Sequence, residues 1–153
     1  MPNENPNLTI VMADDDEDDR IFAKDAFEAN HLDVDMRFVE DGEQLMDYLY
    51  HRGDYSDPES SPRPGLILLD LNMPRKDGRE ALKEIKTDRT LCTIPVVVLT
   101  TSSAEEDIIH TYQLGVNSFI TKPVTFPGLV EVIRQMEDYW FQLVKLPKAK
   151  VDA

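Results

Sequence analysis

Four short apolar runs of this chain each end just before a residue that carries a charge or a hydroxyl group. Buried strands of a parallel sheet consist of nearly continuous apolar residues, and open α/β sheets bind ligands where the carboxyl ends of their strands meet. The runs are residues 10–13 before Asp14 and Asp15, 66–69 before Asp70, 96–99 before Thr100, and 119–120 before Lys122. The sequence therefore predicts a parallel sheet whose polar end residues share one crevice.

The segments between the apolar runs show the periodicity of helices, which indicates an α/β fold. Apolar residues recur at helical spacing after each run, and one segment alternates apolar and polar residues as a half-buried strand does. The expected helices lie at 16–30, 45–50, 81–85, 102–114 and 126–144, the alternating strand at 34–38, and a surface loop at 51–65. Ser102 or Ser103 is expected to cap the fourth helix, and Thr125 the fifth. Five successive βα units predict an α/β fold, a doubly wound five-stranded parallel sheet with helices on both faces.

The chain of 153 residues has room for one compact domain. We expect residues 1–7 to form a flexible N-terminal segment, residues 8–146 the domain and residues 147–153 a C-terminal tail. A separate output domain is not expected. The N-terminal segment is polar and contains two prolines, unlike a signal peptide. No apolar run approaches the ~18 residues of a membrane span, so a soluble, cytoplasmic protein without membrane contact is expected.

The chain is strongly acidic. It has 16 lysine and arginine residues against 30 aspartate and glutamate residues, a formal net charge of -14. Because nucleic-acid binding depends on neutralising phosphates with basic groups, direct binding to DNA or RNA is not expected. Cys92 is the only cysteine, which excludes an internal disulfide and a thiolate metal cluster. The histidines, His31, His51 and His110, show no ligand spacing and are expected at the surface.

Three carboxylates are predicted to converge at the strand ends. Asp14, Asp15 and Asp70 would repel one another, by roughly 4 kcal/mol for two charges ~4 Å apart at an effective dielectric constant of ~20. Mg²⁺ prefers carboxylate, water and phosphate oxygens and would relieve this repulsion. Lys122 adds a cation that can pair with Asp70, and Thr100 adds a hydroxyl donor. Asp70 follows the most apolar run and is predicted to be the nucleophile that accepts a phosphoryl group as an acyl phosphate.

Four motifs resemble those of two-component response-regulator receiver domains. They are Ala-Asp-Asp-Asp-Glu-Asp-Asp-Arg (13–20), Leu-Leu-Asp-Leu-Asn-Met-Pro (68–74), Val-Leu-Thr-Thr-Ser (98–102) and Thr-Lys-Pro (121–123). Each alone would be weak, but together and in this order they are specific and cover nearly the whole chain. The resemblance implies a (βα)5 CheY-like, or flavodoxin-like, fold with strand order 2-1-3-4-5. It also implies a phosphorelay role in which a histidine kinase phosphorylates Asp70.

The resemblance implies a magnesium site with four protein ligands. Asp15 would bind Mg²⁺ directly and Asp14 through a water molecule, and Asp70 would contribute its carboxylate. The backbone carbonyl of Asn72 would complete the set. A calcium loop is a weaker alternative, because Asp19 stands where such a loop needs glycine.

The resemblance also implies a conformational switch. Thr100 would move toward the phosphoryl group while Phe119 turns inward to fill the space that the threonine leaves. Pro123 would follow a cis peptide bond that aims Lys122 at the site. Many receivers carry a small residue after the switch hydroxyl, whereas this chain has Thr101. The larger side chain predicts slow loss of the phosphate, because it hinders the attacking water.

Two further segments resemble the phytochrome-associated single-domain regulators. They are Pro-Arg-Lys-Asp-Gly-Arg-Glu (74–80) and Tyr-Trp-Phe-Gln-Leu-Val-Lys-Leu-Pro (139–147). A phytochrome-type histidine kinase is therefore a candidate phosphate donor. Without a DNA-binding or catalytic output of its own, the protein is expected to signal to a downstream protein effector of unknown identity.

The last predicted helix, residues 126–144, is longer than a strand. Its 19 or so residues rise ~28 Å, whereas a strand of usual length covers ~17 to 20 Å, so the end of the helix should overhang the sheet. Tyr139, Trp140 and Phe141 lie there, and exposed aromatic side chains are typical of an interface. A homodimer through the fourth and fifth helices is expected; the alternative is that these rings fold back on their own domain.

Two other functions compete with the phosphoacceptor prediction. A magnesium-dependent phosphohydrolase with an aspartyl nucleophile would turn over many substrate molecules. Such enzymes usually carry the nucleophile on the first strand and a second acid two positions later, where this chain has Asn72. A docking module that is never phosphorylated would not need a complete crevice. Taken singly, Thr100 could instead begin a helix cap and Lys122 could be an ordinary surface lysine. The sequence favours a phosphoacceptor that is not a turnover enzyme.

Overall fold

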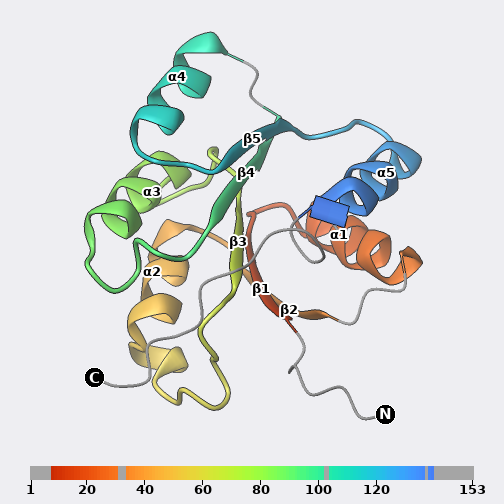
Figure 1. The fold of residues 1–153 in the computed structure, drawn as a ribbon. Helices are drawn as coiled ribbons and strands as arrows, with labels where there is room; N and C mark the ends of the chain where they lie inside the picture. The colour runs from red at the N-terminus through yellow and green to blue at the C-terminus, as the bar shows by residue number, and fades with distance from the viewer. Residues whose placement is uncertain (1–7, 31–33, 102–103, 137, 140–153) are drawn as a thin grey trace.

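A parallel sheet of five strands forms the centre of the protein. The computed structural model describes residues 8–30, 34–101, 104–136 and 138–139. The strands are β1 (Leu8–Ala13), β2 (Val34–Val39), β3 (Leu66–Leu69), β4 (Val96–Thr100) and β5 (Ser118–Thr121). Their order is β2-β1-β3-β4-β5, and every neighbouring pair is parallel (Figure 1). The predicted fold class and strand order are confirmed.

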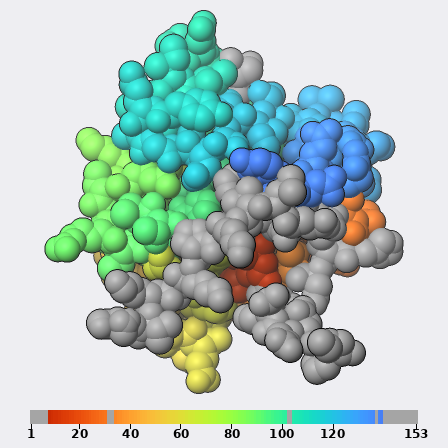
Figure 2. All heavy atoms as spheres, in the orientation of Figure 1, coloured from red at the N-terminus to blue at the C-terminus, as the bar shows by residue number. Residues whose placement is uncertain are grey.

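Helices cover both faces of this sheet. One face carries α1 (Glu17–Ala29) and α5 (Phe126–Met136), and the other carries α2 (Gly42–Tyr50), α3 (Gly78–Thr87) and α4 (Glu105–Gln113) (Figure 1). Figure 2 shows α4 projecting at one end of the molecule. Among the residues that the structure describes, no helix combines the length and the apolar character that a membrane span requires.

The central strand β3 explains why its sequence is continuously apolar. Ile67 and Leu69 point into the core cluster beneath α2 and α3, whereas Leu66 and Leu68 belong to the cluster beneath α1 and α5. All four side chains are buried. Because both faces of this strand are covered, a polar residue at any of the four positions would be buried. The strand ends at Leu69, and Asp70, the first polar residue after it, lies at the carboxyl end of the sheet.

The starts of the helices differ in their capping. The Asp16 side chain accepts hydrogen bonds from the backbone N–H groups of the first turn of α1, and Asp77 and Glu80 form a capping box at α3. The Thr125 hydroxyl accepts a hydrogen bond from the N–H of Gly128 at 3.1 Å, as a cap of α5 would.

The predicted serine cap of α4 is wrong. The helix begins at Glu105 with Ala104 as its N-cap, which makes no side-chain cap hydrogen bond because it has no side-chain oxygen. Ser102 and Ser103 lie outside the described residues. The predicted continuation of α5 beyond residue 136 also lies largely outside them.

The connection 51–65 is more ordered than the sequence indicates. It contains a short 3-10 helix, η1 (Gly53–Tyr55), and side chains from β2 and α2 hold it. The Arg37 guanidinium donates to the Ser60 carbonyl at 2.6 Å, and the Tyr48 hydroxyl donates to the Pro62 carbonyl at 2.7 Å. These long-range contacts involve backbone carbonyls, which no residue pattern specifies.

Candidate functional site

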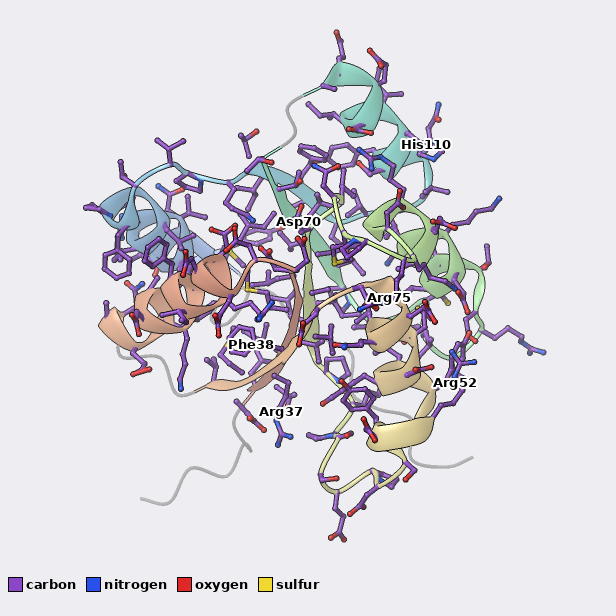
Figure 3. The ribbon with its side chains drawn as sticks, turned by 180° about the vertical axis from the view of Figure 1, so that it is seen from behind. Arg37, Phe38, Arg52, Asp70, Arg75 and His110 are labelled. Atoms are coloured by element: carbon purple, nitrogen blue, oxygen red, sulfur yellow. The ribbon has the colours of Figure 1, made fainter. Side chains whose placement is uncertain are left out.

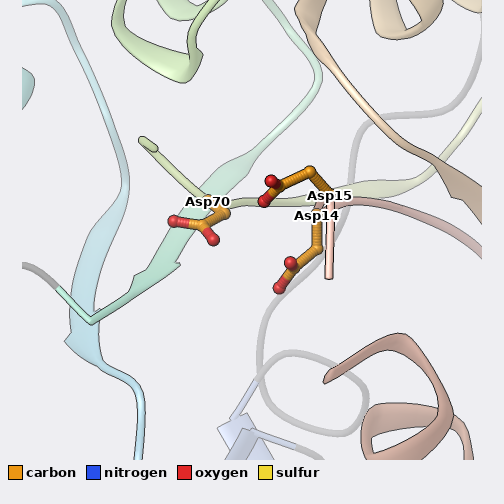
Figure 4. Close-up of side chains that lie close together, drawn as sticks. All are labelled: Asp14, Asp15 and Asp70. Carbon is orange, nitrogen blue, oxygen red and sulfur yellow. The ribbon is translucent and has the colours of Figure 1, made fainter. Parts of the chain in front are cut away.

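Three carboxylates meet at the carboxyl ends of β1 and β3. Asp14 and Asp15 follow the last residue of β1, and Asp70 follows the last residue of β3, its neighbour in the sheet. One oxygen from each carboxylate lies within 4.8 Å of the others (Figure 4). Asp14 and Asp70 are buried, whereas Asp15 is exposed. The structure thus brings together the three acids that the sequence predicts to converge.

Lys122 reaches this cluster from the end of β5. Its Nζ donates to Asp14 Oδ2 at 2.7 Å and to Asp19 Oδ2 at 2.8 Å, and it lies 3.4 Å from Asp70 Oδ2. The ammonium therefore contacts Asp70 as expected, but its shortest hydrogen bonds go to Asp14 and Asp19. Three carboxylates, those of Asp14, Asp19 and Asp70, contact this one ammonium group.

Asp19 is a site residue that sequence reasoning missed. No catalytic or metal-binding role is predicted for Asp19 from the sequence, yet Asp19 binds Lys122. A signal for this role exists in the sequence. Asp19 precedes Ala23 by four residues on α1, and residues at that spacing share a helix face. Ala23 is buried, so the face that Asp19 occupies is turned toward the rest of the domain.

Hydrogen-bond donors hold the Asp70 carboxylate on one oxygen. The fully buried Thr100 hydroxyl donates to Asp70 Oδ1 at 2.7 Å, and the Asn72 backbone N–H donates to the same oxygen at 3.2 Å. The other oxygen faces Lys122. Asp70 thus contacts both predicted partners, Thr100 and Lys122, and its carboxylate is fixed in orientation.

The backbone of Asp70 is fixed as well. The start of α3 packs directly on it, since a Cβ atom added to Gly78 would lie 2.2 Å from the Asp70 carbonyl oxygen. The Gly78 N–H donates to the Leu71 carbonyl at 2.9 Å. Glycine is required at this close approach of two backbone segments. The phosphoacceptor candidate therefore has little freedom to move as a whole.

Burial and pairing shift the pKa values of the site in opposite ways. Burial raises the pKa of Asp14, and hydrogen bonds from Lys122 and from the Asp16 N–H only partly offset this. Burial alone would lower the pKa of Lys122, but its hydrogen bonds with Asp14 and Asp19 outweigh burial, and the net shift is upward. Lys122 therefore stays charged at neutral pH.

The donor set fits a hard divalent cation. Asp14, Asp15 and Asp70 offer only oxygen ligands, which suit magnesium or manganese rather than softer metals. With Asp19 included, the negative charge of the cluster exceeds that of the single ammonium by three. A divalent cation would offset most of this excess, so the residues present fit such an ion.

The switch candidates occupy neighbouring strands. Phe119 on β5 is half-buried and packs against the core cluster beneath α2 and α3. Its backbone N–H donates to the hydroxyl of Tyr112 on α4 at 3.2 Å. Thr100 ends β4, beside β5 in the sheet, and Thr101 is exposed.

The predicted cis bond before Pro123 is absent. No cis peptide bond occurs among the described residues, so the Lys122–Pro123 bond is trans. The trans form is the intrinsically preferred one, and in this geometry Lys122 already reaches the acidic cluster.

The predicted interface residues are only partly described. Tyr139 is exposed, as predicted for a ring at the overhanging end of the last helix. Trp140 and Phe141 lie outside the described residues.

The geometry and the family comparison lead to the same class. The pattern that defines the response regulator receiver domain matches residues 10–134, which is most of the chain. The chain belongs to this family, whose members are the phosphoacceptors of phosphorelay signalling. Receiver domains bind a divalent metal at the acidic pocket, which here is formed by Asp14, Asp15 and Asp70.

Individual proteins similar to this chain show which members of the receiver family it resembles. Response regulator Rcp1 of Synechocystis sp. is 41% identical over 145 residues, which cover 95% of this chain and 97% of Rcp1. The crystal structure of the phosphorylated cyanobacterial phytochrome response regulator RcpA superposes with a TM-score of 0.87 at 40% identity, covering 94% of this chain and 100% of RcpA. The Mn²⁺-bound form of Rcp1 gives a TM-score of 0.84 at 40% identity, with 94% and 100% coverage. The chain is therefore homologous to phytochrome response regulators.

Proposed function

We propose that Asp70 accepts a phosphoryl group from a phytochrome-type histidine kinase in the presence of Mg²⁺. The observation that supports this most directly is the setting of the Asp70 carboxylate. One oxygen accepts from Thr100, the other faces Lys122, and the acids that fit a divalent cation lie beside it. The kinase class is inferred from the likeness to RcpA and Rcp1.

The reaction is a phosphoryl transfer between two side chains. A carboxylate oxygen of Asp70 attacks the phosphorus of the phosphohistidine, the P–N bond breaks, and the imidazole leaves with the electron pair. Lys122 and Thr100 stand where they can donate to the phosphoryl oxygens, and they lose their bonds to the Asp70 carboxylate as they do so. Mg²⁺ held by Asp14, Asp15, Asp70 and the Asn72 carbonyl would neutralise charge on the incoming phosphoryl group.

The switch follows from the movement of Thr100. Its buried hydroxyl donates to Asp70 Oδ1, and the side chain turns as it exchanges this bond for one to a phosphoryl oxygen. Phe119, on the adjacent strand and half-buried at the edge of the core, turns inward to fill the vacated space. Buried space is refilled because an empty cavity in a packed core is unfavourable. The surface of β5 and α4 then differs between the two states.

The proposed output is a change in protein contacts. We infer a homodimer that uses α4 and α5, with Tyr139, Trp140 and Phe141 at the interface; the exposure of Tyr139 supports this. A monomeric mass at tens of micromolar, with and without phosphorylation, would contradict it. Phosphate loss is expected to be slow because Thr101 stands beside the switch hydroxyl. An unchanged decay rate in Thr101→Ala would contradict that part.

One experiment tests the phosphoacceptor role against both rivals. The protein is incubated with Mg²⁺ and acetyl phosphate, and its intact mass and the released phosphate are measured. We expect one labile phosphoryl group, which is absent in Asp70→Asn. Asp54→Asn, a change to an exposed acid on η1, is the matched control and should behave as wild type. Continuous rapid hydrolysis would favour a phosphohydrolase, and no adduct would favour a docking module that is not phosphorylated.

A further inference from the structure

A two-pronged ion pair joins α3 to α4. Arg79 Nε donates to Asp107 Oδ1 and Arg79 Nη2 donates to Asp107 Oδ2, both at 2.7 Å. The two side chains are 29% and 18% exposed, so the pair is largely shielded from water. Planar, bidentate pairs of this kind are the stronger members of their class. Arg79 is the second residue of α3, and Asp107 lies in the first turn of α4.

The rest of α4 is weakly anchored. Thr111 is its only fully buried residue, and the apolar side chains of Ile109 and Tyr112 are each about half exposed. The helix has no side-chain cap at its start. Helices with few buried apolar contacts open at low free-energy cost. Among the described residues, the ion pair to Arg79 is a shielded contact that ties the first turn of α4 to the start of α3.

Arg79 also interacts electrostatically with Asp70, the proposed phosphoacceptor. It follows Gly78, whose backbone packs on the Asp70 carbonyl. Its hydrogen bonds with Asp107 raise the pKa of Arg79, and the charge of Asp70 adds to this upward shift. The Oδ2 atom of Asp77, the N-cap of α3, lies 3.7 Å from Arg79 Nη1. Arg79 thus lies in the field of three acids, and a change of charge at Asp70 alters the balance among them.

We propose that the Arg79–Asp107 pair is a latch that holds α4 in the unphosphorylated protein, and that phosphorylation of Asp70 opens it. This inference rests on the proposed phosphorylation of Asp70. An acyl phosphate brings about two negative charges and three acceptor oxygens where one carboxylate stood, a target that suits the guanidinium fork. Arg79 turns toward it and releases Asp107. The released carboxylate remains in the first turn of α4, where the helix N-terminus favours negative charge.

The latch is tested by amide hydrogen exchange of residues 105–113, with Mg²⁺ present and with or without acetyl phosphate. Asp107→Asn removes the charge of the latch but keeps the shape of the side chain. We expect exchange in this variant, before phosphorylation, to be about tenfold faster than in wild type, within the range of typical coupling between sites. Phosphorylation of wild type should give a similar increase, and phosphorylation of the variant should add little.

The matched control removes a second bidentate ion pair between an arginine and an aspartate. Arg37 and Asp35 on β2 pair through 2.9 and 3.0 Å bonds, and Figure 3 shows Arg37 on the opposite side of Asp70 from His110 of α4. Asp35→Asn should leave exchange in α4 and its response to phosphorylation as in wild type. Arg79→Lys, which keeps the charge but loses the fork, should be intermediate, and it replaces Asp107→Asn if that variant does not fold.

An equal increase on phosphorylation in wild type and in Asp107→Asn would overturn the latch, and so would unchanged exchange in unphosphorylated Asp107→Asn. The intact mass of each sample separates this failure from that of the proposed function. If wild type gains no phosphoryl group, the phosphoacceptor role is wrong. Exchange in the unphosphorylated variants still decides whether the pair restrains α4.

Discussion

The helices α3 and α4 cover the same face of the sheet, yet they are held in different ways. The first has a capping box, and it buries Ala81, Leu82 and Ile85 in the core. The second has no side-chain cap and buries only Thr111. The backbone at the start of α3 touches that of Asp70, whereas the first turn of α4 contacts α3 through the ion pair between Asp107 and Arg79.

The difference matches the two tasks of a receiver domain. A phosphoacceptor has to be held in a fixed geometry, which calls for rigid surrounding elements. A signalling surface has to adopt more than one arrangement, which calls for an element of low local stability. In this chain the strongly packed α3 supports Asp70, and the lightly packed α4 is free to respond.

The largest expected effect comes from breaking the contact between α3 and Asp70. Gly78→Ala places a Cβ atom against the Asp70 carbonyl, so the backbone has to shift, and we expect a loss of roughly 3 kcal/mol in the free energy of unfolding. Urea denaturation measures it. Gly53→Ala is the control: its Cβ meets nothing within 4 Å, and only the positive φ of 59° disfavours alanine there, by about 1 kcal/mol. Equal losses in the two variants would contradict the close packing of α3.

A smaller effect is expected from the cap of α3. Asp77→Ala removes the acceptor of the Glu80 N–H and leaves the first turn with an unsatisfied donor, which should lower the free energy of unfolding by about 1 kcal/mol. Asp77→Asn keeps a side-chain acceptor and should lose much less. Urea denaturation of both variants is the measurement, and an equal loss would mean that the charge, rather than the cap, stabilises α3.

Adding a capping side chain at the start of α4 should stabilise this helix. Ala104 has an extended backbone, with φ -64° and ψ 131°, which suits a capping side chain. Ala104→Ser supplies a hydroxyl acceptor without adding charge to a first turn that already holds three acids, and we expect a gain of about 0.5 kcal/mol. Slower amide exchange in residues 105–113 would reveal it. Ala104→Val, which offers no acceptor, should bring no gain, and equal protection in both variants would show that capping is not the cause.

The smallest expected effect is a pH dependence at the end of α3. Hydrogen bonds from the hydroxyls of Thr90 and Tyr50, with backbone N–H groups, lower the pKa of the Asp88 carboxyl from 3.8 to about 2. Because the pKa is lower in the folded state, this stabilisation is complete above the ordinary pKa and is lost as the pH falls toward 2. Tyr50→Phe should raise the pKa of Asp88, as measured by NMR titration of its carboxyl carbon. Tyr55→Phe is the control, and an identical titration in wild type and Tyr50→Phe would contradict the bond.

Periodicity and residue type were enough to predict most of the fold. The continuous apolar run before Asp70 indicated a strand buried on both faces, and β3 is buried on both faces. The placement of Asp14, Asp15 and Asp70 at strand ends predicted their convergence, because parallel strands present their carboxyl ends at one edge. These are consequences of local pattern and of a shared sheet direction.

The amino-acid sequence by itself determined the strands and the polar residues that end them, since each strand and its end are a pattern of neighbouring residues. The chemistry of the crevice follows because parallel strands present these ends at one edge of the sheet. Only the tertiary structure decided that Lys122 bonds most closely to Asp14 and Asp19, that its bond to Pro123 is trans, and that α4 begins after Ala104. The same holds for the pairing of Arg79 with Asp107, 28 positions apart in the chain. Such contacts depend on how packed helices and strands place their side chains in space, and no spacing along the chain records that arrangement.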